Sequence, residues 1–484
     1  MGRATDPRTH RRVAGLRAGS VVVGLLSVLC GSDAHAKELW KSEDGVWEID
    51  LGGHYKSYGA GLLLPGGLVD GTAALSRTLD AAKLQLPAEQ ANLLPSFDPL
   101  PREAGLSTHV ARIQGRVLWG ARLDFEAAWQ IGLSMSSSAA FAKGTALGGA
   151  PVGSSSTAKR RMWDFDPVLV ESGGFLVQHD LDRLALKLSL PHVDLVVGRQ
   201  VLSWGSGKLW NPTDLLSPFA PTDIDKEIRK GVDAVRVSVQ LGSTGLLDAL
   251  WLPQQRAADN GGVLRGQLNL GGYDFSLSAA KYVSDVVFGA DLSGDLGPLG
   301  VHAEAAYTLG ITGWSGGPLK VEERFFRGVG GLEWRPHEKL ILLAEYYFNG
   351  FGATQASGYL AKMKSDRVSR GEIFGAGQHY LGLVASWLAS DLLSANLTVL
   401  GNLQDPSAML VPVLEYSVEQ SVLVRVGGFI PIGKGPDPHA LQALGASDVL
   451  GRTAAFQDAV STLGLRSEYG TSAGGAFVQV AVYR

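Results

Sequence analysis

The chain has 484 residues, one cysteine, 43 basic and 47 acidic side chains, and a formal net charge of −4. This balance gives no support for nucleic-acid binding, for which a basic excess is typical. A single cysteine excludes an intrachain disulfide, and no run of about 18 apolar residues is present that would form a membrane-spanning helix.

The N-terminal segment has the features of a secretory signal peptide. Five arginines precede a short apolar run, Val21–Leu29, and the small residues Ala34 and Ala36 follow it. These features predict cleavage before Lys37, so that residues 1–36 are the signal peptide. Residues 37–484 then form one mature domain.

The mature domain would contain no cysteine, because the single one is Cys30. Cleavage removes five basic and two acidic side chains and leaves a net charge of −7. A lipid anchor on Cys30 is the alternative, but Leu29 stands where a small residue is needed. The fold must be held by something other than disulfides, and the closed hydrogen-bond ladder of a barrel would serve.

Apolar and polar residues alternate from Val46 onwards, which predicts strands. The clearest segment is 122–133, where Phe125 and Trp129 share one face and Asp124 shares the other with further polar residues. A strand with charge on one face and apolar side chains on the other is typical of a barrel wall between lipid and water.

The same alternation recurs along the rest of the chain, in segments of roughly ten residues. Strands are predicted at 46–56, 110–117, 122–133, 183–190, 193–201, 235–241, 264–270, 273–279, 286–293, 301–309, 326–335, 340–348, 381–387, 392–402, 408–417, 421–430 and 477–483. We predict about eighteen strands in all.

The connections between these segments are alternately short and long. Gly271-Gly272 makes a two-residue turn, whereas residues 202–231 make a long loop. The alternation places short turns at the periplasmic end and long loops outside. The sequence therefore predicts an all-β fold, a transmembrane antiparallel β-barrel. A multidomain β-sandwich is the alternative, but no domain boundary is visible.

Aromatic residues at strand ends are typical of the two membrane interfaces. Near the periplasmic end we expect these to face outward: Trp47, Trp119, Tyr273, Trp334, Trp387, Tyr416 and Tyr483. Trp251, Tyr346 and Phe348 are expected near the opposite end.

Charged residues on the polar faces are the predicted pore lining. They are Arg112, Arg116, Arg122, Asp124, Glu126, Lys187, Arg199, Arg236, Arg265, Glu304 and Glu345. Most of the basic residues come from the first half of the barrel, and Glu304 and Glu345 come from the second half. Opposed walls of this kind would select polar solutes and influence anion passage. The alternative is that these side chains are solvated or paired with one another.

Residues 202–231 are the most unusual segment, with two tryptophans and three prolines between two strands. We expect this loop to be folded and to bend into the lumen. Its constriction candidates are Trp204, Lys208, Trp210, Asn211 and Asp214. Asn211–Asp214 predicts a turn followed by a helix start that Asp214 could cap.

The chain resembles a family of porin-like bacterial outer-membrane barrels. Four short motifs carry the resemblance: Gly198-Arg199-Gln200, Ser203-Trp204-Gly205, Asn211-Pro212-Thr213-Asp214 and Gly231-Val232-Asp233. The resemblance implies an outer-membrane channel or exporter and names no substrate. Barrels of this kind usually end in an aromatic residue read by the insertion machinery, whereas this chain ends in Tyr483-Arg484.

Motifs for catalysis are weak. Gly313–Gly317 matches a hydrolase elbow but lacks a following helix, and Gly205–Lys208 lacks the Ser or Thr of a phosphate-binding loop. The ten histidines show no metal-ligand spacing. We therefore expect no catalytic residues, no metal and no cofactor.

The expected function is passive diffusion of small polar or anionic solutes through an outer-membrane channel. The alternative is an export conduit for polysaccharide or lipid within an envelope complex. Expected partners are outer-membrane lipid, the barrel insertion machinery and the solutes, with no nucleic acid. The sequence leaves homo-oligomerisation open.

Overall fold

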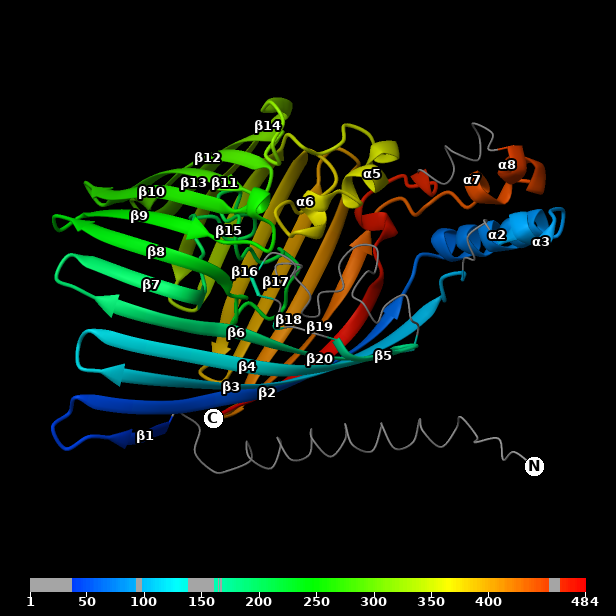
Figure 1. Ribbon diagram of the computed structural model, residues 1–484. Coiled ribbons are helices and arrows are strands. Elements are labelled where there is room, and N and C mark those ends of the chain that lie inside the picture. Colours follow the sequence, from blue (N-terminus) through cyan, green and yellow to red (C-terminus); the bar gives the residue numbers. More distant parts are fainter. Residues whose placement is uncertain (1–36, 93–97, 138–160, 164, 166–167, 452–461) are drawn as a thin grey trace, which may run out of the picture.

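The computed structural model describes residues 37–484 except 93–97, 138–160, 164, 166–167 and 452–461. The predicted signal peptide, residues 1–36, lies outside the described residues. The described part is one antiparallel sheet with helices at one end (Figure 1).

The sheet contains twenty described strands. They are β1 (Lys37–Lys41), β2 (Trp47–Leu63), β3 (Glu103–Trp119), β4 (Leu123–Ser136), β5 (Val168–Ser172), β6 (Phe175–Ser189), β7 (Val193–Gln200), β8 (Val232–Leu241), β9 (Gly245–Leu252), β10 (Gly261–Leu270), β11 (Tyr273–Tyr282), β12 (Asp285–Leu296), β13 (Leu299–Thr312), β14 (Lys320–His337), β15 (Leu340–Asn349), β16 (His379–Ser390), β17 (Leu393–Asn402), β18 (Ser407–Glu419), β19 (Val422–Ile432) and β20 (Gly474–Tyr483).

Eighteen of these strands close into a ring. Each pairs with its neighbour in the chain, except that β4 pairs with β6, and β20 pairs with β2 from His54↔Tyr483 to Leu63↔Gly474. The other two strands lie outside the ring: β1 pairs with β2, and β5 pairs with β6. The prediction of an antiparallel barrel of about eighteen strands is confirmed.

The short turns gather at one end of the barrel and the long connections at the other, as Figure 1 shows. Most strands extend further toward the long connections than predicted; β2 reaches Leu63 and β3 begins at Glu103. Near the outer rim the apolar–polar alternation weakens, because side chains there face loops rather than lipid. The sequence pattern therefore underestimates strand length.

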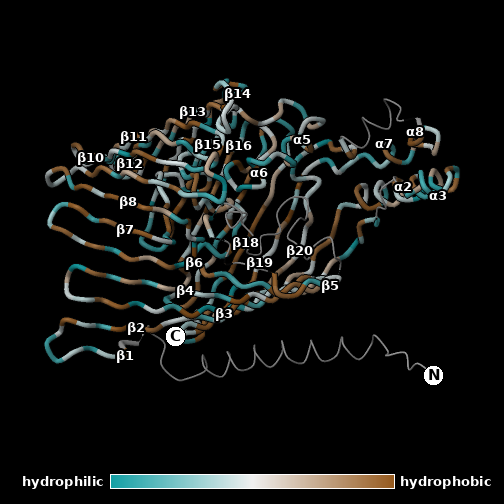
Figure 2. The backbone as a smooth tube through the Cα atoms, in the orientation of Figure 1, coloured by the Kyte–Doolittle hydropathy of each residue, from teal (hydrophilic) through white to brown (hydrophobic). Residues whose placement is uncertain are grey.

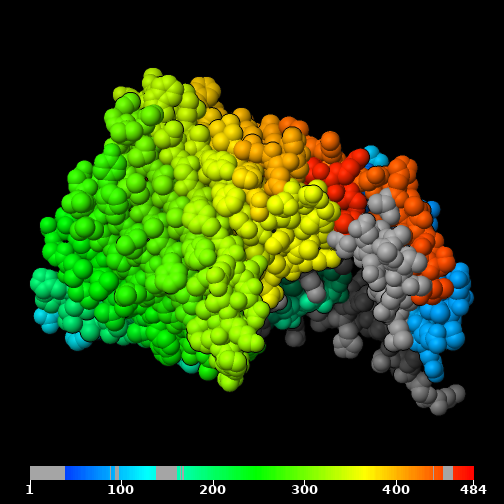
Figure 3. All heavy atoms as spheres, turned by 90° about the horizontal axis from the view of Figure 1, so that it is seen from above, coloured from blue at the N-terminus to red at the C-terminus, as the bar shows by residue number. Residues whose placement is uncertain are grey.

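The outer face of the ring is apolar. Leu264, Leu268 and Leu277 are exposed, whereas the inward Arg265 is buried. Figure 2 shows hydrophobic and hydrophilic residues alternating along the strands, and Figure 3 shows a continuous outer surface from the middle to the C-terminal strands. A folded chain exposes such a band only where lipid covers it.

The predicted aromatic girdles are largely confirmed by exposure on the outer face. Trp47 and Trp119 stack with ring centroids 5.5 Å apart, and both are exposed. Trp334, Trp387, Tyr416, Trp251 and Tyr346 are exposed as well. Tyr483 is a correction: it alternates with outward Val482, and its hydroxyl donates inward to Glu227.

A closed ring with an apolar outer band and aromatic residues at both edges is the architecture of bacterial outer-membrane barrels. The chain is an outer-membrane β-barrel protein. None of the described helices is long and apolar enough to cross a membrane.

The helices belong to the long connections. They are α2 (Gly66–Lys83), α3 (Ala88–Ala91), α5 (Tyr359–Met363), α6 (Asp366–Ser369), α7 (His439–Gln442) and α8 (Ala446–Gly451), with 3-10 turns at Ala257–Asp259, Ala356–Gly358 and Tyr469–Thr471. Leu75 and Leu79 of α2 pack with Leu441 and Val449 beyond the rim. The sequence pattern predicts only a long connection, rich in Gly, Pro and Ala, between the strands at 46–56 and 110–117, and the helix α2 within it was not predicted.

Candidate functional site: the lumen and its loop

Residues 201–231, here called the lumen loop, connect β7 to β8 and fold inside the barrel. Glu345 on β15 accepts hydrogen bonds from three consecutive backbone N–H groups, those of Lys208 at 2.6 Å, Leu209 at 2.9 Å and Trp210 at 3.3 Å. The carboxylate is almost fully buried. A wall carboxylate therefore anchors the loop backbone.

A second wall carboxylate, Glu304 on β13, anchors the same part of the loop. It accepts the Gly207 N–H and, at 2.8 Å, the Thr213 hydroxyl. A Cβ at Gly205, where φ is +91°, would stand 2.5 Å from the Glu304 carboxylate. Glycine lets the backbone come this close and adopt this conformation.

The other side of the lumen loop is anchored by charges of opposite sign. Lys56 on β2 lies 2.6 Å from Asp225 and 2.7 Å from Glu227. Arg425 on β19 and the Tyr483 hydroxyl also bind Glu227, at 2.7 Å and 2.6 Å. The loop is thus bonded to strands on both sides of the lumen.

Apolar packing adds to these anchors. Trp210 is 3% exposed and stacks on Tyr347 at a centroid distance of 5.4 Å, with Tyr380 at 5.9 Å. Leu202 and Leu216 pack against a separate apolar patch on the inner faces of β8–β13. The barrel core therefore lies in the lumen, and the predicted folded, inward loop is confirmed.

The predicted turn at Asn211–Asp214 is present, but the helix after it is not. The Asp214 N–H donates to the Asn211 carbonyl at 3.2 Å, and residues 215–231 form no helix. The Asp214 carboxylate instead binds Ser203, the Ser217 N–H and Arg229, and burial raises its pKa. Pro218 and Pro221 lack the N–H groups that a continuing helix requires.

Trp204 and Asn211 hold the start of the loop. The Asn211 side-chain amide donates to the Trp204 carbonyl at 2.7 Å, and Trp204 packs against the apolar patch under β8–β13. Lys208 contributes its backbone to the Glu345 anchor while its side chain is exposed. All five constriction candidates therefore lie on the folded lumen loop.

The predicted basic wall is largely paired with carboxylates. Its ion pairs are Arg112–Asp182 at 2.5 Å, Arg116–Asp124 at 2.5 Å, Lys187–Asp194 at 2.9 Å, Arg236–Asp248 at 2.9 Å and Arg265–Asp291 at 3.7 Å. Glu304 and Glu345, the predicted acidic wall, bind the loop. Most of these residues are therefore paired with other side chains, as in the alternative interpretation of the charged lining.

Two predicted pore-lining residues lie elsewhere. Arg122 is exposed at the turn before β4. Arg199 pairs in register with Leu184 and shares the side of exposed Val197, which is the outer face. There it binds Asp233 at 2.7 Å and the Trp163 carbonyl, beneath the Phe165 ring.

This outer-face pair joins two of the motifs that carry the family resemblance. Arg199 belongs to Gly198-Arg199-Gln200 and Asp233 to Gly231-Val232-Asp233. The two motifs lie on β7 and β8, which pair with each other where the chain enters and leaves the lumen loop. In the structure, these motifs hold the two ends of the lumen loop side by side.

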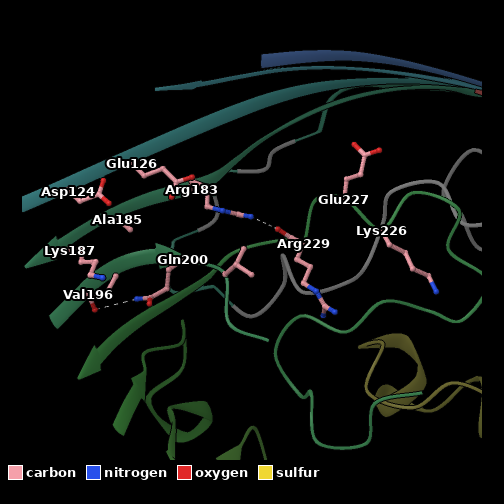
Figure 4. A pocket seen from close by; sticks show the side chains of 11 residues that line it. Asp124, Glu126, Arg183, Ala185, Lys187, Val196, Gln200, Lys226, Glu227 and Arg229 are labelled. Atoms are coloured by element: carbon pink, nitrogen blue, oxygen red, sulfur yellow. Dashed lines mark hydrogen bonds between the residues drawn. The ribbon is translucent and has the colours of Figure 1, made fainter. Parts of the chain in front are cut away.

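The lumen loop leaves space beside it. A cavity of about 430 Å³ lies between the loop and the inner faces of β4, β6 and β7, and Glu126 lines it (Figure 4). A second cavity of about 310 Å³ lies between the start of the loop and β8–β10, lined by Arg236 and Arg265. Both cavities are bordered by charged side chains.

The sequence pattern does not single out several residues of this arrangement. Asp182, Asp225, Glu227 and Arg425 form ion pairs between segments far apart in the chain. Alternation alone places Lys56 on the polar face, but no sequence signal pairs it with Glu227. Within the described residues no group of three or more metal-ligating side chains is present, and the absence of a cofactor stays a prediction.

The Glu227 anchor predicts a specific acid dependence. Burial raises the pKa of Glu227, but hydrogen bonds from Lys56, Tyr483 and Arg425 outweigh it and lower the pKa to about 2. Because the folded pKa is below the ordinary value, this anchor is complete above pH 4.5 and is lost as the pH falls through about 2.

The difference in single-channel current noise, a measure of loop motion, between the Glu227→Gln variant and the native protein should therefore persist from pH 7 to about pH 4 and disappear only in stronger acid. The Glu227→Gln variant should be noisier at neutral pH. A difference between the two proteins that disappears already between pH 6 and pH 5 would contradict this role of Glu227.

The chain is similar to several solved structures. No protein-family model and no curated protein matches the chain. The crystal structure of Acinetobacter baumannii OccAB1 is similar with a TM-score of 0.47 and 8% identity, over 93% of this chain and 99% of that one. That of Pseudomonas aeruginosa OccD3 (OpdP) has a TM-score of 0.45 and 8% identity, over 93% and 94%.

Proposed function

We propose that the protein is a porin-like outer-membrane channel for the passive diffusion of small polar or anionic solutes. The observation that carries the proposal is the pair of charged cavities beside an anchored loop inside a closed barrel. Water-filled space lined by charges on both the loop and the wall suits hydrated solutes. No chemical step and no cofactor is needed for this activity.

The charges beside the larger cavity favour anions slightly. Its basic lining residues are Arg183, Lys187, Lys226 and Arg229, and its acidic lining residues are Asp124, Glu126 and Glu227. Most of the predicted basic wall is paired, and Arg183, Lys187 and Arg229 of this cluster are paired as well, so we attribute any anion preference to Lys226 on the loop. The same residues are the proposed pore lining.

The alternative function is an export conduit or a barrel component of an envelope complex. The anchors on both sides of the lumen loop would favour this alternative only if the anchored loop closed the passage completely. The two cavities favour the channel instead.

Swelling of liposomes that contain the purified protein tests the proposal. We expect swelling in isosmotic solutions of small neutral and anionic solutes, with rates that fall steeply as solute size increases. Heat-modifiable migration in gels verifies that the barrel is folded. A folded protein whose liposomes swell with none of these solutes would contradict the channel and favour the export conduit.

A further inference from the structure

The barrel wall beside the lumen loop holds a small cationic site that the loop itself fills. Lys56 on β2 and Arg425 on β19 supply the positive charges, and their side chains are only 8% and 11% exposed. Lys56 lies 2.6 Å from Asp225 and 2.7 Å from Glu227. Arg425 lies 2.7 Å from Glu227. Two carboxylates of the loop therefore pair with two cations of the wall.

Neutral donors on β20 complete this wall site. The Tyr483 hydroxyl and the Gln479 side-chain amide each donate to a loop carboxylate, at 2.6 Å and 3.3 Å. Arg425 binds Glu415 of the wall through Nε at 2.5 Å and binds the loop through a different nitrogen, Nη2. The Nη2 donor of Arg425 therefore becomes free for another anion whenever the loop carboxylate leaves.

The loop tip that carries these carboxylates can leave the wall without the loss of a helix or a strand. Residues 223–229 belong to neither kind of element. Asp225 and Glu227 are 29% and 32% exposed, and Glu227 lines the larger lumen cavity, so a solute in that cavity reaches the site. Ile224 packs against the apolar cluster around Trp210, which favours return of the tip when the solute leaves.

On the basis of the proposed channel function, we propose that this wall site binds small dianionic solutes and that the two loop carboxylates occupy it as an internal competitor. Lys56 and Arg425 both lose acceptors when the tip leaves, and a dianion replaces them together. Because both loop carboxylates contact one ammonium group, the site takes two negative charges that lie close together, as in succinate or sulfate.

Competition by the loop sets the concentration at which a solute binds. A tethered group acts at an effective concentration of roughly millimolar order, so dianions displace the tip when they are abundant and not when they are scarce. The anchors at Glu304 and Glu345 keep the rest of the loop in place. The solute itself thereby widens the passage beside the loop.

Isothermal titration calorimetry on the full chain in detergent tests this competition. The probes are succinate, whose charges lie on two groups, and sulfate, whose charges lie on one, with acetate as the monoanion and succinamide as the neutral control. Native protein should be half-saturated at roughly millimolar dianion. The Asp225→Asn/Glu227→Gln double variant lacks the internal competitor and should need a concentration lower by about tenfold or more.

Lys56→Gln, added to the double variant, should reverse this gain, and it leaves no loop carboxylate unpaired. Glu338→Gln and Lys339→Gln are matched controls, because both residues are exposed in the turn between β14 and β15 and should leave the native affinity unaltered. Heat-modifiable migration verifies the fold of every variant. Tighter binding of succinate identifies a dicarboxylate as the solute, and tighter binding of sulfate identifies a compact oxyanion such as a phosphate monoester.

Release of the tip has a readout of its own. In planar bilayers, millimolar succinate or sulfate should raise the current noise of the native channel toward that of the Glu227→Gln variant, whereas acetate at the same ionic strength should not. Unaltered noise at saturating concentrations of both dianions would overturn the release.

Equal affinity of the native protein and the double variant for both dianions would overturn the site, as would acetate that binds as tightly as they do. Failure of the channel would look different, because calorimetry needs no conduction. A folded protein that binds dianions and lets no solute through would contradict the proposed function and leave the site in place.

Discussion

Replacing Glu345 by alanine is expected to raise the single-channel conductance and its noise. The substitution leaves the N–H groups of Lys208, Leu209 and Trp210 without their acceptor. Hydrogen bonds to a charged group are worth about 1.5–3 kcal/mol each, so the anchored state should lose about 3 kcal/mol or more. A loss of that size raises the released population roughly a hundredfold.

Glu304 still holds Gly207 and Thr213 in this variant, so the barrel should remain folded while one part of the loop moves. Glu419→Ala is the control, because Glu419 is exposed at the turn between β18 and β19. A folded Glu345→Ala protein with native conductance and native noise would show that this carboxylate does not hold the loop.

Replacing Arg199 by alanine should lower the stability of the folded barrel more than any other substitution proposed for this protein. Arg199 binds Asp233 through two guanidinium nitrogens, at 2.7 Å and 3.0 Å, and its side chain is nearly fully buried. Its loss leaves Asp233 as a buried carboxylate without its cation and frees the Trp163 carbonyl. Breaking a buried pair of this kind costs about 3–5 kcal/mol.

The temperature at which the barrel unfolds in detergent gels measures this loss. Lys187→Ala is a suitable comparison, because the Lys187–Asp194 pair is well exposed, at 40% and 38%, and should be worth less than about 1 kcal/mol. Equal unfolding temperatures for the two variants would show that the Arg199–Asp233 pair does not stabilise the wall.

The strand framework could be predicted from the sequence because each strand has two different surroundings. Lipid on one side and lumen on the other impose a period of two on every segment that crosses, such as 122–133. Closure could be predicted as well, since unpaired edge strands are not tolerated in lipid. The α2 helix was missed although Leu68, Leu75 and Leu79 have helical spacing, because its glycines and alanines suggested a loop.

The pairing inside the lumen could not be predicted. Glu227 and Arg425 are 198 residues apart in the chain, and only the folded loop brings them together. Arg199 is different, because its position two residues after the outward Val197 was a usable signal. Its charge, rather than its register, suggested the lumen, and Phe165 and Trp163 cover it on the outside.

We propose that the anchored lumen loop narrows an open aqueous passage without closing it. Single-channel recording of the native protein in planar bilayers tests this most directly. We predict discrete, steady current steps that are linear in voltage, with a preference for anions. Silence of the folded native protein, with current that appears only when residues 203–229 are deleted, would contradict the claim.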